Sequence, residues 1–81
     1  MIKVKIKCFS QVKYALEVDD LRLELPSGST SSKLEEIIRE MSKGKLDNIS
    51  LRLAINQNYV NSEIELKDGD EVVFIPPVQG G

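Results

Sequence analysis

The residues best suited to chemistry stand at the end of the sequence, where two glycines precede the final carboxylate. Gly80 and Gly81 place no side chain next to that carboxyl group. A tip without Cβ atoms can enter a channel too narrow for any other residue, and an activating group can approach its carbonyl carbon freely. The alternative is an ordinary frayed terminus, because chain ends are often poorly ordered. The tip therefore predicts either a carboxylate that a partner uses or an end without a role.

Residues 76–81 are predicted to form an extended tail beyond a domain of residues 1–75. Two consecutive prolines lack the N–H groups that a sheet ladder needs, and they favour extended backbone. Fully extended, the tail would span roughly 20 Å. Its members are Pro76, Pro77, Val78, Gln79, Gly80 and Gly81. Ordering backbone costs on the order of 1–2 kcal/mol per residue, so a partner that uses this tail must bind it well.

Side chains that usually perform catalysis are scarce. The sequence has no histidine and a single cysteine, Cys8. Ser-His and Cys-His nucleophile pairs, an internal disulfide and a cysteine or histidine metal site are therefore excluded, although lysine and carboxylate chemistry is not. We expect neither a self-contained enzyme nor a permanently bound cofactor.

Length and charge set further bounds. The 81 residues and net charge of −2 fit one small domain. Acidic and basic residues are interspersed, which predicts neither nucleic-acid binding nor a basic membrane anchor. No apolar stretch approaches the roughly 20 residues of a membrane span. We expect a soluble, cytoplasmic protein.

The first 25 residues predict two strands joined by a short helix. Apolar residues at 2, 4, 6 and 8 alternate with lysines at 3, 5 and 7, the period of a half-buried strand with a charged outer face. Phe9 is out of step with the inward side, so we expect it to be exposed, either as a cap on the core edge or in a contact patch. A helix of one or two turns is predicted over residues 10–17, and an alternating strand over residues 21–25.

The main helix is predicted just after residue 30. Leu34, Ile37, Ile38 and Met41 fall on one helical face that can pack on a sheet. Its N-cap is either Ser32, in a capping box with Glu35, or Thr30. Gly44 is placed for the C-cap.

The second half predicts a short strand pair and a central last strand. Strands are expected at residues 51–55 and 59–60, around a turn at 56–58, and another helical turn at 63–66. After a turn at 67–70, the consecutive apolar residues 72–75 predict a strand buried on both faces, in mid-sheet and parallel to the first. The expected fold is α+β: a ubiquitin-like β-grasp, with a mixed sheet of four to five strands, one main helix across one face and a flexible C-terminal Gly-Gly tail.

The sequence resembles the small, sulfur-carrying subunits of molybdopterin synthase, in the ubiquitin-like sulfur-carrier group. The matching segments are residues 1–4, 8–13, 53–57, 68–72 and 76–81, so the resemblance runs the length of the chain. The Asp68-Gly69-Asp70-Glu71 turn, followed by two prolines and Gly-Gly, is typical of sulfur carriers. Phe9 and Asn56-Gln57 narrow the resemblance to the molybdopterin branch.

This resemblance implies that Gly81, not Cys8, carries sulfur. In the family, a ubiquitin-activating-like adenylyltransferase consumes ATP to adenylate the terminal carboxylate, and sulfur transfer then makes a thiocarboxylate. The tail enters the large subunit of molybdopterin synthase, where the active site lies. Sulfur passes there to cyclic pyranopterin monophosphate and builds the dithiolene that holds molybdenum. The family expectation is a heterotetramer of two small and two large subunits.

The resemblance also implies a contact with the large subunit through Phe9, Tyr59 and Ile75, with Lys13 in an ion pair. Ile75 could equally be a core residue. The sequence departs from the commonest family pattern at Ser10, Lys13 and Gln79, and Gln79 leaves the fit of the tail in a narrow channel open. The alternatives are a carrier for thiamine thiazole synthesis or tRNA thiolation, and a β-grasp interaction module without a carrier role.

Overall fold

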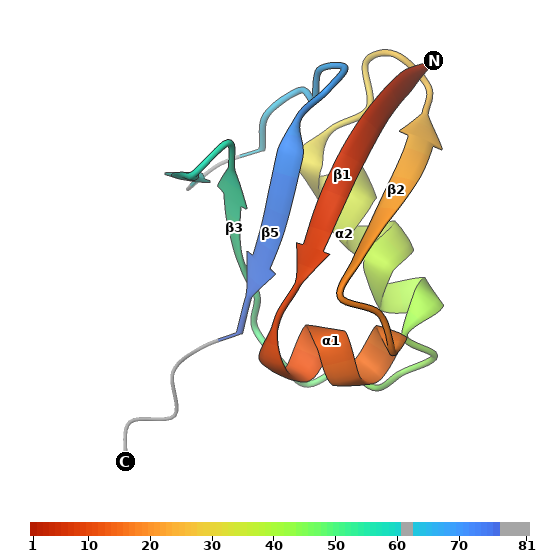
Figure 1. The fold of residues 1–81 in the computed structure, drawn as a ribbon, viewed down its shortest axis with the longest axis vertical. Coiled ribbons are helices and arrows are strands. Elements are labelled where there is room, and N and C mark those ends of the chain that lie inside the picture. The colour runs from red at the N-terminus through yellow and green to blue at the C-terminus, as the bar shows by residue number, and fades with distance from the viewer. Residues whose placement is uncertain (61–62, 77–81) are drawn as a thin grey trace.

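The computed structural model describes residues 1–60 and 63–76 and shows a mixed five-stranded sheet with a helix across one face (Figure 1). The strands lie in the order β2-β1-β5-β3-β4. The strands are β1 (Ile2–Cys8), β2 (Asp20–Leu25), β3 (Arg52–Ile55), β4 (Asn58–Val60) and β5 (Glu71–Ile75), and the helices are α1 (Ser10–Leu16) and α2 (Ser31–Met41). The predicted β-grasp architecture is confirmed, and the predicted tail residues 77–81 lie outside the described residues.

Strand β5 lies at the centre of the sheet, as predicted. It pairs in parallel with β1, where Cys8 faces Phe74, and antiparallel with β3. Because parallel strands point the same way, the C-terminal ends of β1 and β5 lie at the same end of the sheet, beside α1 (Figure 1). The segment that follows Ile75 therefore leaves the domain at the same end as Phe9.

The core fills the space between the inner face of the sheet and α2. Phe74, Ile6 and Val72 from the central strands and Leu34 and Ile38 from α2 are fully buried. Burying each such side chain contributes about 1.5–3 kcal/mol. The rest of the core comprises Ile2, Val4, Cys8, Val12, Ala15, Leu25, Leu46, Ile55 and Leu66.

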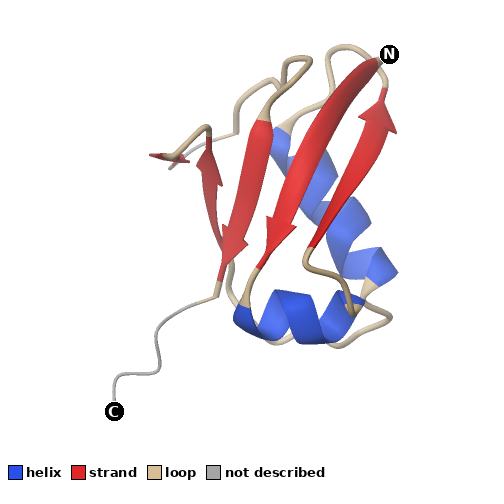
Figure 2. Ribbon diagram, viewed as in Figure 1, coloured by secondary structure: helices blue, strands red, loops and turns tan. Residues whose placement is uncertain are grey.

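The prediction that β5 is buried on both faces is wrong. Val72 and Phe74 are buried, but Val73 and Ile75 are only half-buried. The cause is the two-layer architecture, because α2 covers one face of the sheet and leaves the other open (Figure 2). β-Branched residues on an open face favour the strand without being in the core.

The ends of α2 decide between the predicted caps. Thr30 is the N-cap, with its Oγ1 accepting a hydrogen bond from the N–H of Lys33 at 3.3 Å. The Ser32 capping box is therefore wrong. The helix ends at Met41 with Ser42 as its C-cap, so Gly44 does not cap it. Met41, predicted on the packed face, is 43% exposed at this last turn.

Residues 63–66 were predicted as a helical turn and are not helical. Glu65 forms a bridge to Thr30, and the carbonyl of Ile64 accepts a hydrogen bond from the N–H of Ser31 at 2.8 Å. The Ser31 Oγ in turn accepts from the N–H of Ile64 at 3.1 Å. The segment thus lies extended along the start of α2 and places Leu66 in the core.

Two polar turns fix the start of β5. Asp70 accepts hydrogen bonds from the N–H of Lys67 at 2.8 Å and from the Asn56 side-chain amide at 2.9 Å. Asn56 Oδ1 accepts from the N–H of Glu71 at 3.0 Å. Gly69, at φ +87°, donates its N–H to the carbonyl of Lys3 at 2.7 Å. These bonds lock β5 in register with β1 and β3.

Candidate functional site

The sheet face away from α2, here called the open face, is charged over β1 and β2 and mixed over β5, β3 and β4. The strand register places on it Lys3, Lys5 and Lys7 of β1, Asp20, Arg22 and Glu24 of β2, Glu71, Val73 and Ile75 of β5, Arg52 and Ala54 of β3, and Tyr59 of β4. The predicted lysine row is confirmed as an outer face. Moving from β1 across β5 to β3 and β4, apolar side chains join the charged ones, among which Glu71 and Arg52 remain.

A patch of four residues runs from the ends of β1 and β5 across β3 to Tyr59 on β4. We call it the strand-end patch: Phe9, Ile75, Arg52 and Tyr59. Ile75 faces Arg52 across the β5–β3 pair, and Phe9 follows Cys8, which faces Phe74. Phe9 is 53% exposed and Tyr59 61% exposed. Two large aromatics and an aliphatic side chain beside the exit of the chain make a surface suited to a protein partner.

The predicted interface residues Phe9, Tyr59 and Ile75 therefore lie on one surface, with Phe9 and Ile75 at the ends of β1 and β5 and Tyr59 on β4, opposite Ala54. Ile75 is on the open face and half-buried, so its place is on this surface and not in the core. Exposed aromatics at the centre of a contact commonly contribute most of its binding energy.

Arg52 was not predicted as a site residue, and the structure adds it. The two-residue turn at Asn56 and Gln57, with φ of 50° and 71°, is the type I′ geometry that sets Ala54 opposite Tyr59. Arg52, two residues earlier on the same face, lies diagonally across and places its guanidinium carbon 4.8 Å from the centre of the Tyr59 ring. A two-residue turn at Asn56-Gln57 implies that Ala54 lies opposite Tyr59 and that Arg52 lies on the same face, so the sequence carries a signal for this cation–π pair.

Lys13, predicted to pair with a partner, already has a partner within the domain. Its Nζ lies 2.7 Å from Asp19 Oδ1. The hydrogen bond to Asp19, followed by the attraction between the two charges, raises the pKa of Lys13 above its ordinary value of 10.5. The ammonium is exposed, so water screens this pair and another carboxylate can compete for it.

Phe9 and Lys13 line an open hollow of about 440 Å³ beside the end of β1, together with Lys7, Cys8, Ser10, Tyr14, Asp19 and Asp20. Cys8 is 2% exposed. Burial, then the charges of Asp20 and Asp19, raise the pKa of its thiol above 9.0. A buried, protonated thiol is a poor nucleophile, which agrees with the prediction that Cys8 is a core residue.

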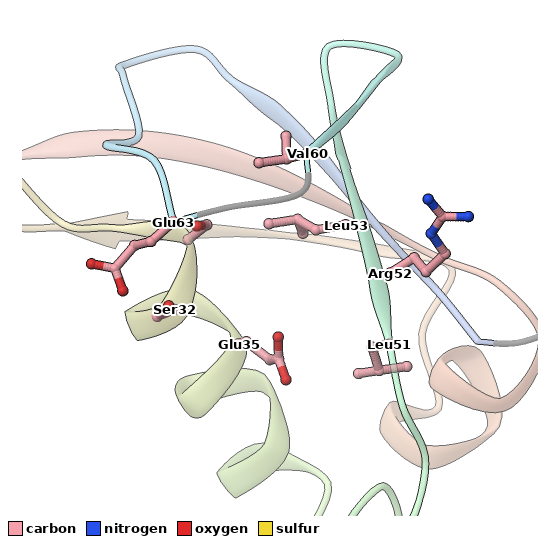
Figure 3. A pocket seen from close by; sticks show the side chains of 8 residues that line it. Ser32, Glu35, Leu51, Arg52, Leu53, Val60 and Glu63 are labelled. Carbon is pink, nitrogen blue, oxygen red and sulfur yellow. The ribbon is translucent and has the colours of Figure 1, made fainter.

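A second hollow, of about 320 Å³, lies on the other side of β3, between that strand and the start of α2 (Figure 3). Glu35 and Leu53 face it, and Arg52 also lines it, although its guanidinium extends away from α2 (Figure 3). Within residues 1–60 and 63–76, no group of three or more acidic, cysteine or histidine side chains could hold a metal ion. In the same part of the chain, no helix is long and apolar enough to cross a membrane.

The tail is only partly within the described structure. Pro76 is buried at the end of β5. The predicted tail residues Pro77, Val78, Gln79, Gly80 and Gly81 lie outside the described residues. What the structure establishes is the exit point, between the end of β1 and the start of β3.

The parallel β1–β5 pair, the strand order and the single covering helix define a protein of the ubiquitin-like β-grasp class. The chain belongs to the ThiS family, whose model matches residues 6–81.

Named relatives agree with this placement. The molybdopterin synthase sulfur carrier subunit of Arabidopsis thaliana is 31% identical over 81 residues, covering 99% of this chain and 84% of that protein. Among solved structures, a putative molybdopterin converting factor subunit 1 from Pyrococcus furiosus has a TM-score of 0.86 at 33% identity, covering 96% of this chain and all of that one. A complex of subunits 1 and 2 of the molybdopterin-converting factor from Helicobacter pylori has a TM-score of 0.68 at 23% identity, over 99% of this chain and 100% of its own, and shows the fold alone.

Proposed function

We propose that the chain is the sulfur carrier subunit of a molybdopterin synthase and that the carboxylate of Gly81 carries the sulfur. The observation behind the proposal is the position of β5, which delivers the following segment at the strand-end patch. Relatives that are molybdopterin synthase sulfur carrier subunits support it, as does a family match that runs through residue 81.

The proposed chemistry uses this chain as a carrier, with catalytic groups supplied by partners. An adenylyltransferase joins the Gly81 carboxylate to AMP from ATP, releasing pyrophosphate and creating a good leaving group. A sulfur nucleophile attacks the acyl carbon, AMP departs, and a thiocarboxylate results. The bare glycines leave that carbon accessible to both steps.

The thiocarboxylate then acts inside a large subunit. We propose that residues 76–81 enter its active site, held by the contact at Phe9, Tyr59 and Ile75, and donate sulfur to cyclic pyranopterin monophosphate. Each donation forms a carbon–sulfur bond to the substrate, and water then cleaves the acyl–sulfur bond and restores the Gly81 carboxylate; two such donations give the dithiolene. The related structure that joins subunits 1 and 2 supports a large-subunit partner; two copies of each, working in the cytoplasm, is the arrangement we propose.

Intact mass spectrometry tests the carrier role. The full chain is incubated with ATP, a sulfur donor and an activating enzyme of the molybdopterin pathway, and its mass is measured against a known carrier treated in parallel. We expect a gain equal to the replacement of one oxygen by sulfur, located at Gly81. Deleting Gly81 should abolish sulfur transfer and leave the unfolding temperature unchanged.

If the control carrier gains the sulfur mass and this chain does not, the assignment to the molybdopterin pathway is contradicted. The thiazole and tRNA-thiolation pathways would then be tried with their own activating enzymes. Failure with all three would leave a binding module without a carrier role.

A further inference from the structure

We propose that Arg52 recognises a carboxylate on the large subunit that receives the tail. This inference rests on the function proposed above and adds a specificity-determining cation to the strand-end patch. It commits to an aspartate or glutamate of the large subunit, placed to meet the guanidinium when the sheet's open face is covered.

Arg52 is the cation of the strand-end patch, and no acidic side chain of the described chain pairs with it. The ion pairs found among residues 1–60 and 63–76 join Lys7 to Glu71, Lys13 to Asp19 and Arg39 to Glu35. The Arg52 side chain is exposed, and in that part of the chain its aromatic contact with Tyr59 is its specific interaction. The described acidic side chains therefore leave the charge of Arg52 without a neutralising partner.

The contact with Tyr59 does not use the N–H donors of the Arg52 guanidinium. Stacking on a ring occupies the flat face of the group, whereas its five N–H donors lie in the plane and point outward. Arg52 lies 4.8 Å above the ring centre. Holding the fork in one orientation before binding reduces the side-chain entropy lost on association, and a fixed fork fits both oxygens of a carboxylate.

The surroundings of Arg52 select a charged acceptor. Its cross-strand neighbour is Ile75, and the patch continues to Phe9. A partner that covers these apolar side chains also removes water from the guanidinium, and a desolvated charge is costly unless an opposite charge meets it. A neutral carbonyl would compensate only in part.

The test measures binding of the full chain to the large subunit by titration calorimetry. R52Q is compared with R22Q, because Arg22 is an exposed arginine of the same open face on β2, opposite Lys5. Both variants change the net charge equally. We expect R52Q to weaken binding about tenfold to hundredfold, and R22Q to change it less than about threefold.

Two further variants identify the chemistry of the acceptor. R52E should bind more weakly than R52Q, because it sets a carboxylate against a carboxylate, while R22E should not differ from R22Q beyond a small long-range effect. R52K keeps the charge but loses the planar fork and should bind less tightly than the wild type. Unfolding temperatures confirm that each variant is folded.

Contrary results are distinct from a failure of the proposed function. If the wild type binds the large subunit and accepts sulfur but R52Q behaves like R22Q, Arg52 has no part in recognition. If R52E and R52Q bind equally, the acceptor is not a carboxylate. If the wild type neither binds nor accepts sulfur, the proposed function fails and this inference fails with it.

Discussion

The side-chain amide of Asn56 donates a hydrogen bond to Asp70 Oδ1 at 2.9 Å, joining two turns that are 14 residues apart in the sequence. The same Asn56 accepts from the N–H of Glu71 and donates its own N–H to the Glu71 carbonyl at 2.8 Å. One residue thus ties the β3–β4 turn to the turn before β5 and aligns the first residue of β5. The segment beyond β5 starts from a position that these bonds fix.

Replacing Asn56 by alanine should destabilise the domain by about 2 kcal/mol. The variant loses two side-chain hydrogen bonds and places alanine at φ 50°, where asparagine is tolerated better. Urea denaturation followed by circular dichroism measures the loss. Asn58→Ala is the matched control, since its side chain makes one local bond to the Asn56 carbonyl at 3.1 Å. An equal loss in both variants would contradict the role given to Asn56.

Truncating Phe9 should weaken large-subunit binding without affecting folding. Phe9→Ala removes an exposed ring from the strand-end patch, and an aromatic anchor of this kind contributes about 1–4 kcal/mol to binding. The free energy of unfolding should change by less than about 0.5 kcal/mol. Tyr14→Ala serves as the control, because Tyr14 is a 79% exposed aromatic on α1, outside the patch. Stronger weakening by Tyr14→Ala would move the interface onto α1.

Cys8 should be dispensable for sulfur carriage. Cys8→Ala removes a buried thiol and should cost about 1 kcal/mol of stability, while the sulfur-dependent mass gain at Gly81 remains. A thiol reagent at neutral pH should modify wild-type Cys8 slowly in the folded protein and rapidly in urea, because burial and two nearby carboxylates raise its pKa. Loss of the mass gain in folded Cys8→Ala would implicate the thiol after all.

The Lys13–Asp19 pair predicts a measurable titration difference. The pKa of Lys13 is raised in the folded state. Any stability that the pair contributes is therefore fully present below the unfolded pKa of Lys13 and is lost as the pH rises through its folded pKa, above 10.5. Asp19→Asn should bring the Lys13 pKa back toward its ordinary value, as read from side-chain NMR shifts across pH 9–12. Identical titration curves for the two proteins would show that the contact does not persist in solution.

Much of the architecture follows from the sequence because period and turn chemistry are local. The alternating first strand, the apolar stripe from Leu34 to Ile38, and the Asn56-Gln57 turn each specify one element, and the consecutive apolar residues of β5 place that strand in mid-sheet. The details that failed depend on distant contacts. Residues 63–66 have a composition compatible with a helical turn, but their hydrogen bonds to Ser29 and Ser31 hold them extended.

The same division applies to the site. Phe9 could be singled out as an exposed aromatic from its phase, and Tyr59 as a contact residue from the family resemblance. The pairing of Lys13 with Asp19 could not, because it depends on the left-handed turn at Glu17, φ 60°, that brings the chain back from α1 to β2. Thr30 and Ser32 are both good caps in composition, and the extended backbone at Thr30 decides between them.

The central position of β5 has a mechanical consequence. Its hydrogen-bond ladders to β1 on one side and β3 on the other run across the strand. Tension applied to the chain beyond Pro76 therefore loads both ladders together in shear, and they cannot be opened one bond at a time as at an edge strand. A force on the tail is therefore transmitted to the whole domain, because a central strand separates from the sheet only when the domain unfolds.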